Sequence, residues 1–137
     1  MHHEIRLKLR NDIRELARVN QVASEFLGRE NLSEETVYAT HLALEEILSN
    51  VIRHGYEALG NHEISVCIRL EKGRVDLQVE DDGREFDPLS APAVDVGVPL
   101  EERRVGGLGI HLLRKVAAEI RYRRAGGRNR LDVRIRS

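Results

Sequence analysis

Apolar and polar residues alternate on both sides of a Lys72-Gly73 pair near the middle of the chain. Such alternation is typical of strands that bury one face, and a short glycine-containing turn between two of them predicts a β-hairpin. We therefore expect an antiparallel sheet with one buried face. The apolar positions that carry the alternation are Ile64, Val66, Ile68, Leu70, Val75, Leu77 and Val79.

Other strand and helix patterns flank this hairpin. Their order, β-α-α-β-β-loop-α-β-β, predicts an α+β fold: a two-layer sandwich of a mixed, mostly antiparallel sheet with helices on one face. The predicted strands cover residues 3–10, 120–124 and 131–135, the last two joined by a Gly126-Gly127 turn. The predicted helices run from Asn11 or Asp12 to Gly28, from Ser33 to about Gly55 or Tyr56, and from Gly107 to about Glu119.

Length and composition predict one soluble domain over residues 1–137. The chain is 41% hydrophobic and 33% charged, and no apolar stretch approaches the roughly 20 residues that cross a bilayer. The first ten residues lack the apolar core of an export signal. The single cysteine, Cys67, fits a reducing compartment and is expected inside a strand as a small apolar residue. These features predict a cytoplasmic protein without a membrane partner.

Charge is distributed unevenly along the chain. Residues 76–102 hold nine acidic residues and one basic residue, whereas residues 103–137 hold eleven basic and two acidic residues. The basic segment is open to two interpretations, a nucleic-acid surface or the solvated face of alternating strands. Tyr122 is its only aromatic residue, which offers little for bases to stack on, so nucleic acid is an unfavoured partner.

Three motifs carry candidate chemistry, and the first is EEILSNVIRHG on the second predicted helix. Glu46 and Asn50 are four residues apart and share a helix face, which His54 continues. A carboxylate placed there could orient a hydroxyl or a water, and an amide oxygen could ligate Mg²⁺. Taken alone, the same residues also fit an ordinary solvated helix face.

The second motif, VEDDGREFDP, places Asp81 at a strand end and Gly83 in the turn that follows. The acid could accept a hydrogen bond from an exocyclic amine, and the glycine would let a flat ring approach the backbone. The third motif, RRVGGLGIHLLRK, leads glycines into a helix, whose first N–H groups suit phosphate. Between these motifs lies a segment of about 25 residues without periodicity, a length that usually marks a functional loop.

The order of the three motifs resembles the GHKL nucleotide-binding superfamily and, within it, the small bacterial anti-sigma factor serine kinases. The resemblance implies that Glu46 is the general base, that Asn50 ligates Mg²⁺ and that His54 lies near the phosphates. Asp81 would bind the adenine amine, with Gly83 admitting the ring. Residues 88–105 would form the ATP lid. Further implied nucleotide contacts are Phe86, Arg104, Gly106, Gly107, Leu108, Gly109 and Asn129.

This chain departs from the family pattern at three positions. Glu85 stands where a glycine is frequent, Val105 where an arginine is common, and Asn129 where threonine is more usual. None of these departures removes a residue with a proposed catalytic role. They concern nucleotide contacts outside the three motifs.

The resemblance implies an ATP-dependent anti-sigma factor serine/threonine kinase with ATP and Mg²⁺ as cofactors. It would phosphorylate an antagonist protein and alternately hold a sigma factor, and homodimerisation through the N-terminal strand or first helix is consistent with it. The main alternative is a non-catalytic nucleotide-binding anti-sigma or regulatory switch. A split histidine kinase is less consistent with the sequence, which shows no helix pair bearing a phosphoacceptor histidine.

Overall fold

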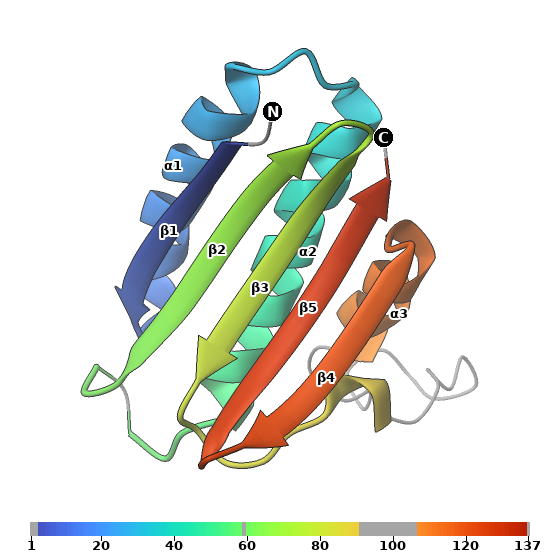
Figure 1. Cartoon of the computed structure of the whole chain (residues 1–137). Coiled ribbons are helices and arrows are strands. Elements are labelled where there is room, and N and C mark those ends of the chain that lie inside the picture. The colour runs from blue at the N-terminus through green and yellow to red at the C-terminus, as the bar shows by residue number, and fades with distance from the viewer. Residues whose placement is uncertain (1–2, 59, 91–106, 137) are drawn as a thin grey trace.

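A five-stranded sheet forms one layer of the molecule (Figure 1). The computed structural model describes residues 3–58, 60–90 and 107–136, without the side chains of residues 90 and 107–111. The strands lie in the order β1-β2-β3-β5-β4, and all four neighbouring pairs are antiparallel. Their bounds are β1 (His3–Arg10), β2 (Glu63–Glu71), β3 (Arg74–Asp81), β4 (Glu119–Ala125) and β5 (Arg128–Arg136).

The helices form the second layer and all lie on the same side of the sheet (Figure 1). This arrangement confirms the predicted α+β sandwich, although the described strands include no parallel pair. Two short 3₁₀ turns, η1 (Ile13–Glu15) and η2 (Pro88–Ser90), accompany the helices. The helices are α1 (Leu16–Gly28), α2 (Glu34–His54) and α3 (Gly107–Val116). None of the helices within the described ranges is both long and apolar enough to cross a membrane.

The core lies between the two layers and follows the alternation of the sequence. Ile64, Val66 and Ile68 of β2, for example, are buried, while Ser65 and Cys67 between them face the open side of the sheet. The hairpin turns fall where predicted, because Gly73, Gly126 and Gly127 adopt positive φ angles of 81°, 60° and 75°, a region that L side chains disfavour.

Side-chain caps define where the helical segments begin. Ser33 accepts a hydrogen bond from the Thr36 N–H at 3.1 Å and thereby caps α2. Asp12 caps η1 by accepting from the Arg14 N–H at 2.9 Å. Asn11, the other predicted cap, is instead fully buried and binds the loop that precedes β2.

One detail of the sequence-based prediction is wrong. The third helix ends at Val116 rather than near Glu119, because the Ala118 N–H bonds to the Arg134 carbonyl at 2.8 Å and Glu119 already pairs with β5. Cys67 lies within β2, as predicted, and is partly exposed on the open face of the sheet. Its removal from water raises the pKa of the thiol.

Candidate functional site

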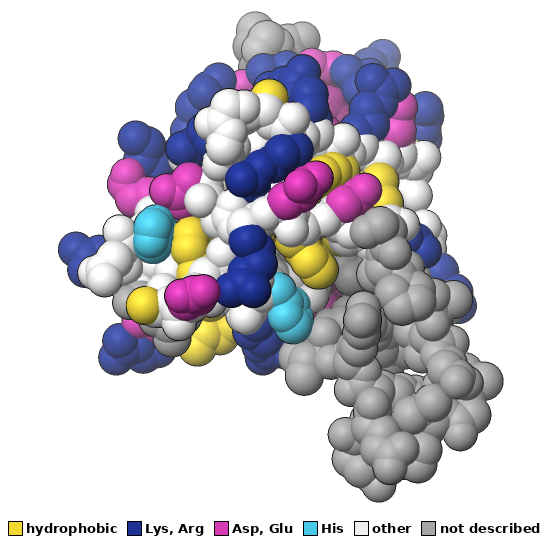
Figure 2. Space-filling view, turned by 90° about the horizontal axis from the view of Figure 1, so that it is seen from below, with side chains coloured by type: hydrophobic (Ala, Val, Ile, Leu, Met, Phe, Trp, Pro, Cys, Tyr) yellow, Lys and Arg dark blue, Asp and Glu magenta, His cyan; other side chains and the backbone are white. Residues whose placement is uncertain are grey.

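The candidate site lies where β3 ends beside the last turn of α2. Figure 2 shows this end of the molecule, where histidine, acidic and basic side chains surround small apolar patches. Asp81, the last residue of β3, is only 3% exposed. A carboxylate with so little contact with water is costly to bury, so its hydrogen bonds decide what it can do.

One oxygen of the Asp81 carboxylate is occupied by the protein itself. Oδ1 accepts hydrogen bonds from the Gly83 N–H at 2.9 Å and from Asn129 Nδ2 at 3.0 Å. Burial raises the pKa of Asp81, and these two hydrogen bonds oppose that shift. With Oδ1 fixed in this way, Oδ2 is the oxygen that remains to accept a hydrogen bond from a ligand.

Asn129 forms hydrogen bonds with Asp81 and with two of the residues around it. Its Nδ2 also donates to the Arg84 carbonyl at 2.8 Å, and its Oδ1 accepts from the Tyr122 hydroxyl at 2.5 Å. Both amide hydrogens therefore have partners, and the orientation of the amide is set by the Arg84 carbonyl, which can only accept. Asn129 is thus built into the wall of the site as a positioning residue.

Gly83 packs directly against the C-terminal end of α2. A Cβ atom added at Gly83 would lie 2.6 Å from the Gly55 carbonyl oxygen and 3.0 Å from Asp81 Oδ1. The same carbonyl accepts a hydrogen bond from the Arg84 N–H at 2.9 Å. Arg124 donates to the Gly83 carbonyl at 2.7 Å from the β4 side. The turn after Asp81 is therefore held from both sides, which leaves no space for a side chain at Gly83.

A small apolar pocket lies above Asp81, with a cavity volume of about 20 Å³. Phe86 lines it and stacks on His54 with 5.6 Å between ring centroids. The cavity is too small for a planar heterocycle, so a ring could enter only after residues that line it, Phe86 and Pro88 among them, move apart. The remaining lining residues are Ile47, Asn50, Val51, Val79, Asp81, Tyr122, Asn129 and Leu131.

Asn50 presents an oxygen to the same pocket. Its Nδ2 donates to the Glu46 carbonyl at 2.6 Å, and since a carbonyl can only accept, Oδ1 must be the atom that faces away from the helix backbone. Asn50 is 6% exposed, so this oxygen is held in place by packing. An amide oxygen of this kind is an acceptable ligand for Mg²⁺.

Glu46 lies one turn before Asn50 and is half-buried. Burial raises the pKa of its carboxyl, the nearby charge of Glu45 raises it further, and Arg53 opposes both effects. A raised pKa brings a carboxylate closer to the working range of a general base. The described residues contain no group of three or more His, Cys, Asp or Glu side chains that could enclose a metal ion.

The structure brings Glu46, Asn50, His54, Asp81, Gly83, Phe86 and Asn129 to one end of the sandwich. Of the remaining predicted contacts, Arg104 and Gly106 lie outside the described residues, as does most of the predicted lid. Gly107, Leu108 and Gly109 form the first turn of α3, although their side chains are not described.

Sequence reasoning missed the contributions of Gly55, Tyr122 and Arg124. The first motif already ends on Gly55, but its packing against Gly83 depends on how the helix meets the turn. Tyr122 and Arg124 alternate on the inner side of β4, where the register sets them opposite Leu131 and Asn129. That alternation could have identified them, had the pairing of β4 with β5 been combined with the Asp81 position.

The sequence of this chain is similar to those of known proteins. A family model described as the histidine kinase-like ATPase domain matches residues 9–135. The serine/threonine-protein kinase BtrW of Bordetella bronchiseptica is 26% identical over 105 residues, 77% of this chain and 74% of that protein. The serine-protein kinase RsbW of Listeria monocytogenes is 26% identical over 127 residues, 88% of this chain and 80% of that protein.

Solved structures show the same fold. The structure of the RsbU and RsbW domains of Rv1364c from Mycobacterium tuberculosis matches 98% of this chain with a TM-score of 0.67 at 15% identity. This chain spans about a third of that one, 32% of its length, and the likeness concerns the fold alone. Since the family match runs from the last residues of β1 into β5 and confirms the GHKL resemblance of the three motifs, the chain belongs to the family of histidine kinase-like ATPase domains.

Proposed function

We propose that this chain binds ATP with Mg²⁺ and acts as a serine/threonine kinase of the anti-sigma factor type. The observation that carries the proposal is Asp81, a buried carboxylate with one oxygen fixed by the protein and the other left for a ligand. Relatives named as serine-protein kinases support the same activity at 26% identity.

The residues present fit an adenine nucleotide. Asp81 Oδ2 would accept a hydrogen bond from the exocyclic amine, and Gly83 would let the ring pass close to the backbone. Ile47 and Val51 offer apolar surface on the α2 side. Phe86, which lines the present cavity of about 20 Å³ and stacks on His54, would move to admit the ring.

The phosphate end of the site would be served by α2 and α3. Asn50 would offer Oδ1 as a metal ligand, and the first turn of α3, with Gly107 and Gly109, would offer backbone N–H groups to phosphate oxygens. Bound ATP would supply the phosphoryl group, and Mg²⁺ would neutralise charge on it. Glu46 would accept the proton of the attacking serine or threonine hydroxyl, a role that its raised pKa favours.

The proposed partners follow from the same family resemblance. They are an anti-sigma antagonist as phosphoacceptor, a sigma factor held alternately, and a second copy of the chain as a homodimer, all in the cytoplasm. The second candidate function is a nucleotide-binding switch without transfer. The low identity to the named kinases favours it. A site can also bind nucleotide through groups such as Asp81 without having a functional general base.

Transfer of label from γ-labelled ATP to a candidate antagonist protein tests the proposal. Glu46→Gln should lower transfer by about 10²–10⁴-fold while nucleotide affinity stays close to that of the unaltered chain. Glu25→Gln is the matched control, because it makes the same change on an exposed residue of α1. Transfer that survives Glu46→Gln would exclude Glu46 as the base, and tight binding without any transfer would establish the switch.

A further inference from the structure

The outward face of β4 and β5 carries far more positive than negative charge. Six arginines face the open side of these two strands against two carboxylates, Glu119 and Asp132. Including the outward row of β3 adds Arg74, Asp76 and Glu80, which still leaves seven arginines and four carboxylates. The six arginines are Arg121, Arg123, Arg128, Arg130, Arg134 and Arg136.

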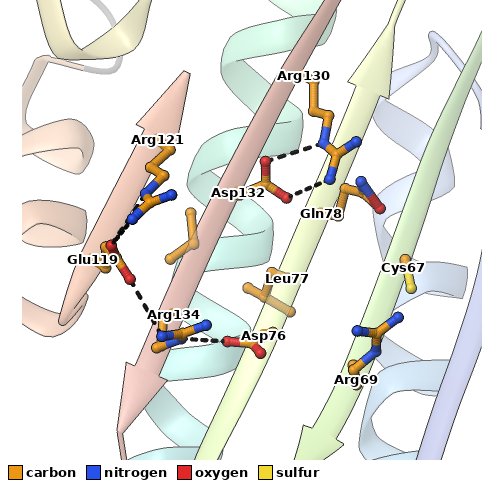
Figure 3. Close-up of a pocket in the computed structure, with 11 residues that line it drawn as sticks. Cys67, Arg69, Asp76, Leu77, Gln78, Glu119, Arg121, Arg130, Asp132 and Arg134 are labelled. Atoms are coloured by element: carbon orange, nitrogen blue, oxygen red, sulfur yellow. Dashed lines mark hydrogen bonds and ion pairs between the residues drawn. The ribbon is translucent and has the colours of Figure 1, made fainter. Parts of the chain in front are cut away.

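Some of these arginines are held in place by neighbouring acids (Figure 3). Arg134 bridges Asp76 at 3.0 Å and Glu119 at 3.4 Å, and Arg130 contacts Asp132 at 3.1 Å. Arg121 pairs with Glu119 at 2.7 Å. Each of these acids forms an ion pair with an arginine of the same face, so the paired residues form an ordered network with little net charge.

The other arginines of this face have few or no ion-pair partners among the described residues. With the described residues, Arg123 and Arg136 form no ion pair, and Arg128 approaches Glu80 only at 3.9 Å. The register also sets Arg123 directly opposite Arg130 and Arg136 directly opposite Arg74. Like charges directly opposite each other destabilise a sheet, so folding stability does not explain these pairings. Arrangements that oppose stability are typical of binding surfaces.

The same face is hollowed. A depression of about 400 Å³ runs over β2, β3, β5 and β4, and its rim includes Arg69, Arg121, Arg130 and Arg134 (Figure 3). Four arginines and three carboxylates, Asp76, Glu119 and Asp132, line it, so its lining is polar with a small excess of positive charge. None of the residues that line it is aromatic, so it offers nothing on which a nucleic-acid base could stack.

We propose that the outward face of β4 and β5 binds an acidic segment of a partner protein. The guanidinium groups of Arg123 and Arg136, together with that of Arg128, which contacts Glu80 only at 3.9 Å, would receive its carboxylates. The ion pairs around Arg130 and Arg134 would keep the surface rigid. The face is the opposite side of the sheet from Asp81 and the α2 residues, so the interaction requires neither nucleotide nor transfer.

Fluorescence anisotropy with two labelled peptides tests this proposal on the full chain. A peptide of alternating glutamate and serine should bind, and its affinity should fall as ionic strength rises, because the contacts are exposed ion pairs. The matched peptide of lysine and serine should not bind. Equal binding of both peptides, or none of the acidic one, would overturn the proposal.

Arg123→Glu assigns the binding to this face. The affinity for the acidic peptide should fall by about fivefold, because the variant turns one exposed attraction between opposite charges into a repulsion. The reversal also sets a glutamate opposite Arg130, so folding stability should hold or rise while binding falls. Arg29→Glu is the control, because it makes the same charge change on an exposed residue that follows α1.

Several outcomes would contradict the proposal. A drop in stability with Arg123→Glu would show that Arg123 serves the fold. The chain could also bind a single-stranded oligonucleotide more tightly than the acidic peptide. If Arg123→Glu removed that binding, the face would be assigned to nucleic acid. A concentration-dependent dimer in sedimentation that Arg123→Glu dissociates would assign it to a second copy of the chain.

Discussion

Replacing Gly83 with alanine should damage the turn after Asp81 through the backbone of α2. The added Cβ would lie 2.6 Å from the Gly55 carbonyl oxygen and 3.1 Å from the Gly55 carbonyl carbon. Real Cβ atoms do not approach backbone this closely, and neither group can rotate away as a side-chain end could. The turn and the end of α2 must therefore separate.

Two costs follow from that separation. Forcing an extra carbon into a packed site typically costs about 1–3 kcal/mol. Moving the turn also weakens the Arg84 N–H to Gly55 hydrogen bond of 2.9 Å, a contact worth about 1 kcal/mol. Together they predict that Gly83→Ala lowers the free energy of unfolding by about 2–4 kcal/mol, with Asp81 losing its fixed orientation as well.

Urea unfolding followed by circular dichroism measures this loss, provided that the slope with denaturant is unchanged. Gly28→Ala is the matched control, because a Cβ there meets nothing within 4 Å and the residue ends α1. Alanine in a helix should leave stability unchanged or raise it by up to about 1 kcal/mol. An unfolding free energy for Gly83→Ala within about 0.5 kcal/mol of the unaltered chain would refute the packing argument.

Two further changes test the loop before β2 and the edge of the sheet. Asn11→Ala should lower the unfolding free energy by about 2–4 kcal/mol, since this buried side chain binds three backbone groups of residues 58–62; exposed Asn61→Ala should cost almost nothing in the same urea assay. Arg69 lowers the pKa of Glu4 from 4.5 to about 2, so the folded state binds fewer protons than the unfolded state between these values. Stability should therefore fall as pH drops through that window. In Glu4→Gln, the urea concentration at the unfolding midpoint should depend less on pH over the same range.

The sheet could be predicted from sequence because its signal is local. Strict alternation around Lys72-Gly73 and around Gly126-Gly127 specifies both hairpins, with their glycines at positive φ. The end of the third helix could not be predicted in the same way. Its pattern continues toward Glu119, and only the hydrogen bond from Ala118 to the Arg134 carbonyl ends it in favour of β4.

The candidate site could be predicted in part for a related reason. Glu46 and Asn50 are four residues apart on one helix, so their shared face needs no tertiary knowledge. The contact between Gly83 and Gly55, by contrast, joins two elements through backbone atoms. The role of Asn129 depends on its pairing with Asp81 across β3 and β5. Such pairings become visible only when the strand order is known.

Strand β5, which pairs with β3, contributes to both proposed binding surfaces. The register sets Asp81 opposite Asn129 on the inner face and Glu80 opposite Arg130, one step away, on the outer face. Since successive strand residues face opposite sides, a slip of one residue would break both pairs and set Asp81 opposite Arg128 or Arg130 instead. Side-chain changes can nevertheless separate the two surfaces. Glu46→Gln alters the helix layer without touching the outer face, and Arg123→Glu alters the outer face without touching Asp81. If the two surfaces are separate, Glu46→Gln should therefore lose transfer but keep acidic-peptide binding, and Arg123→Glu should do the reverse.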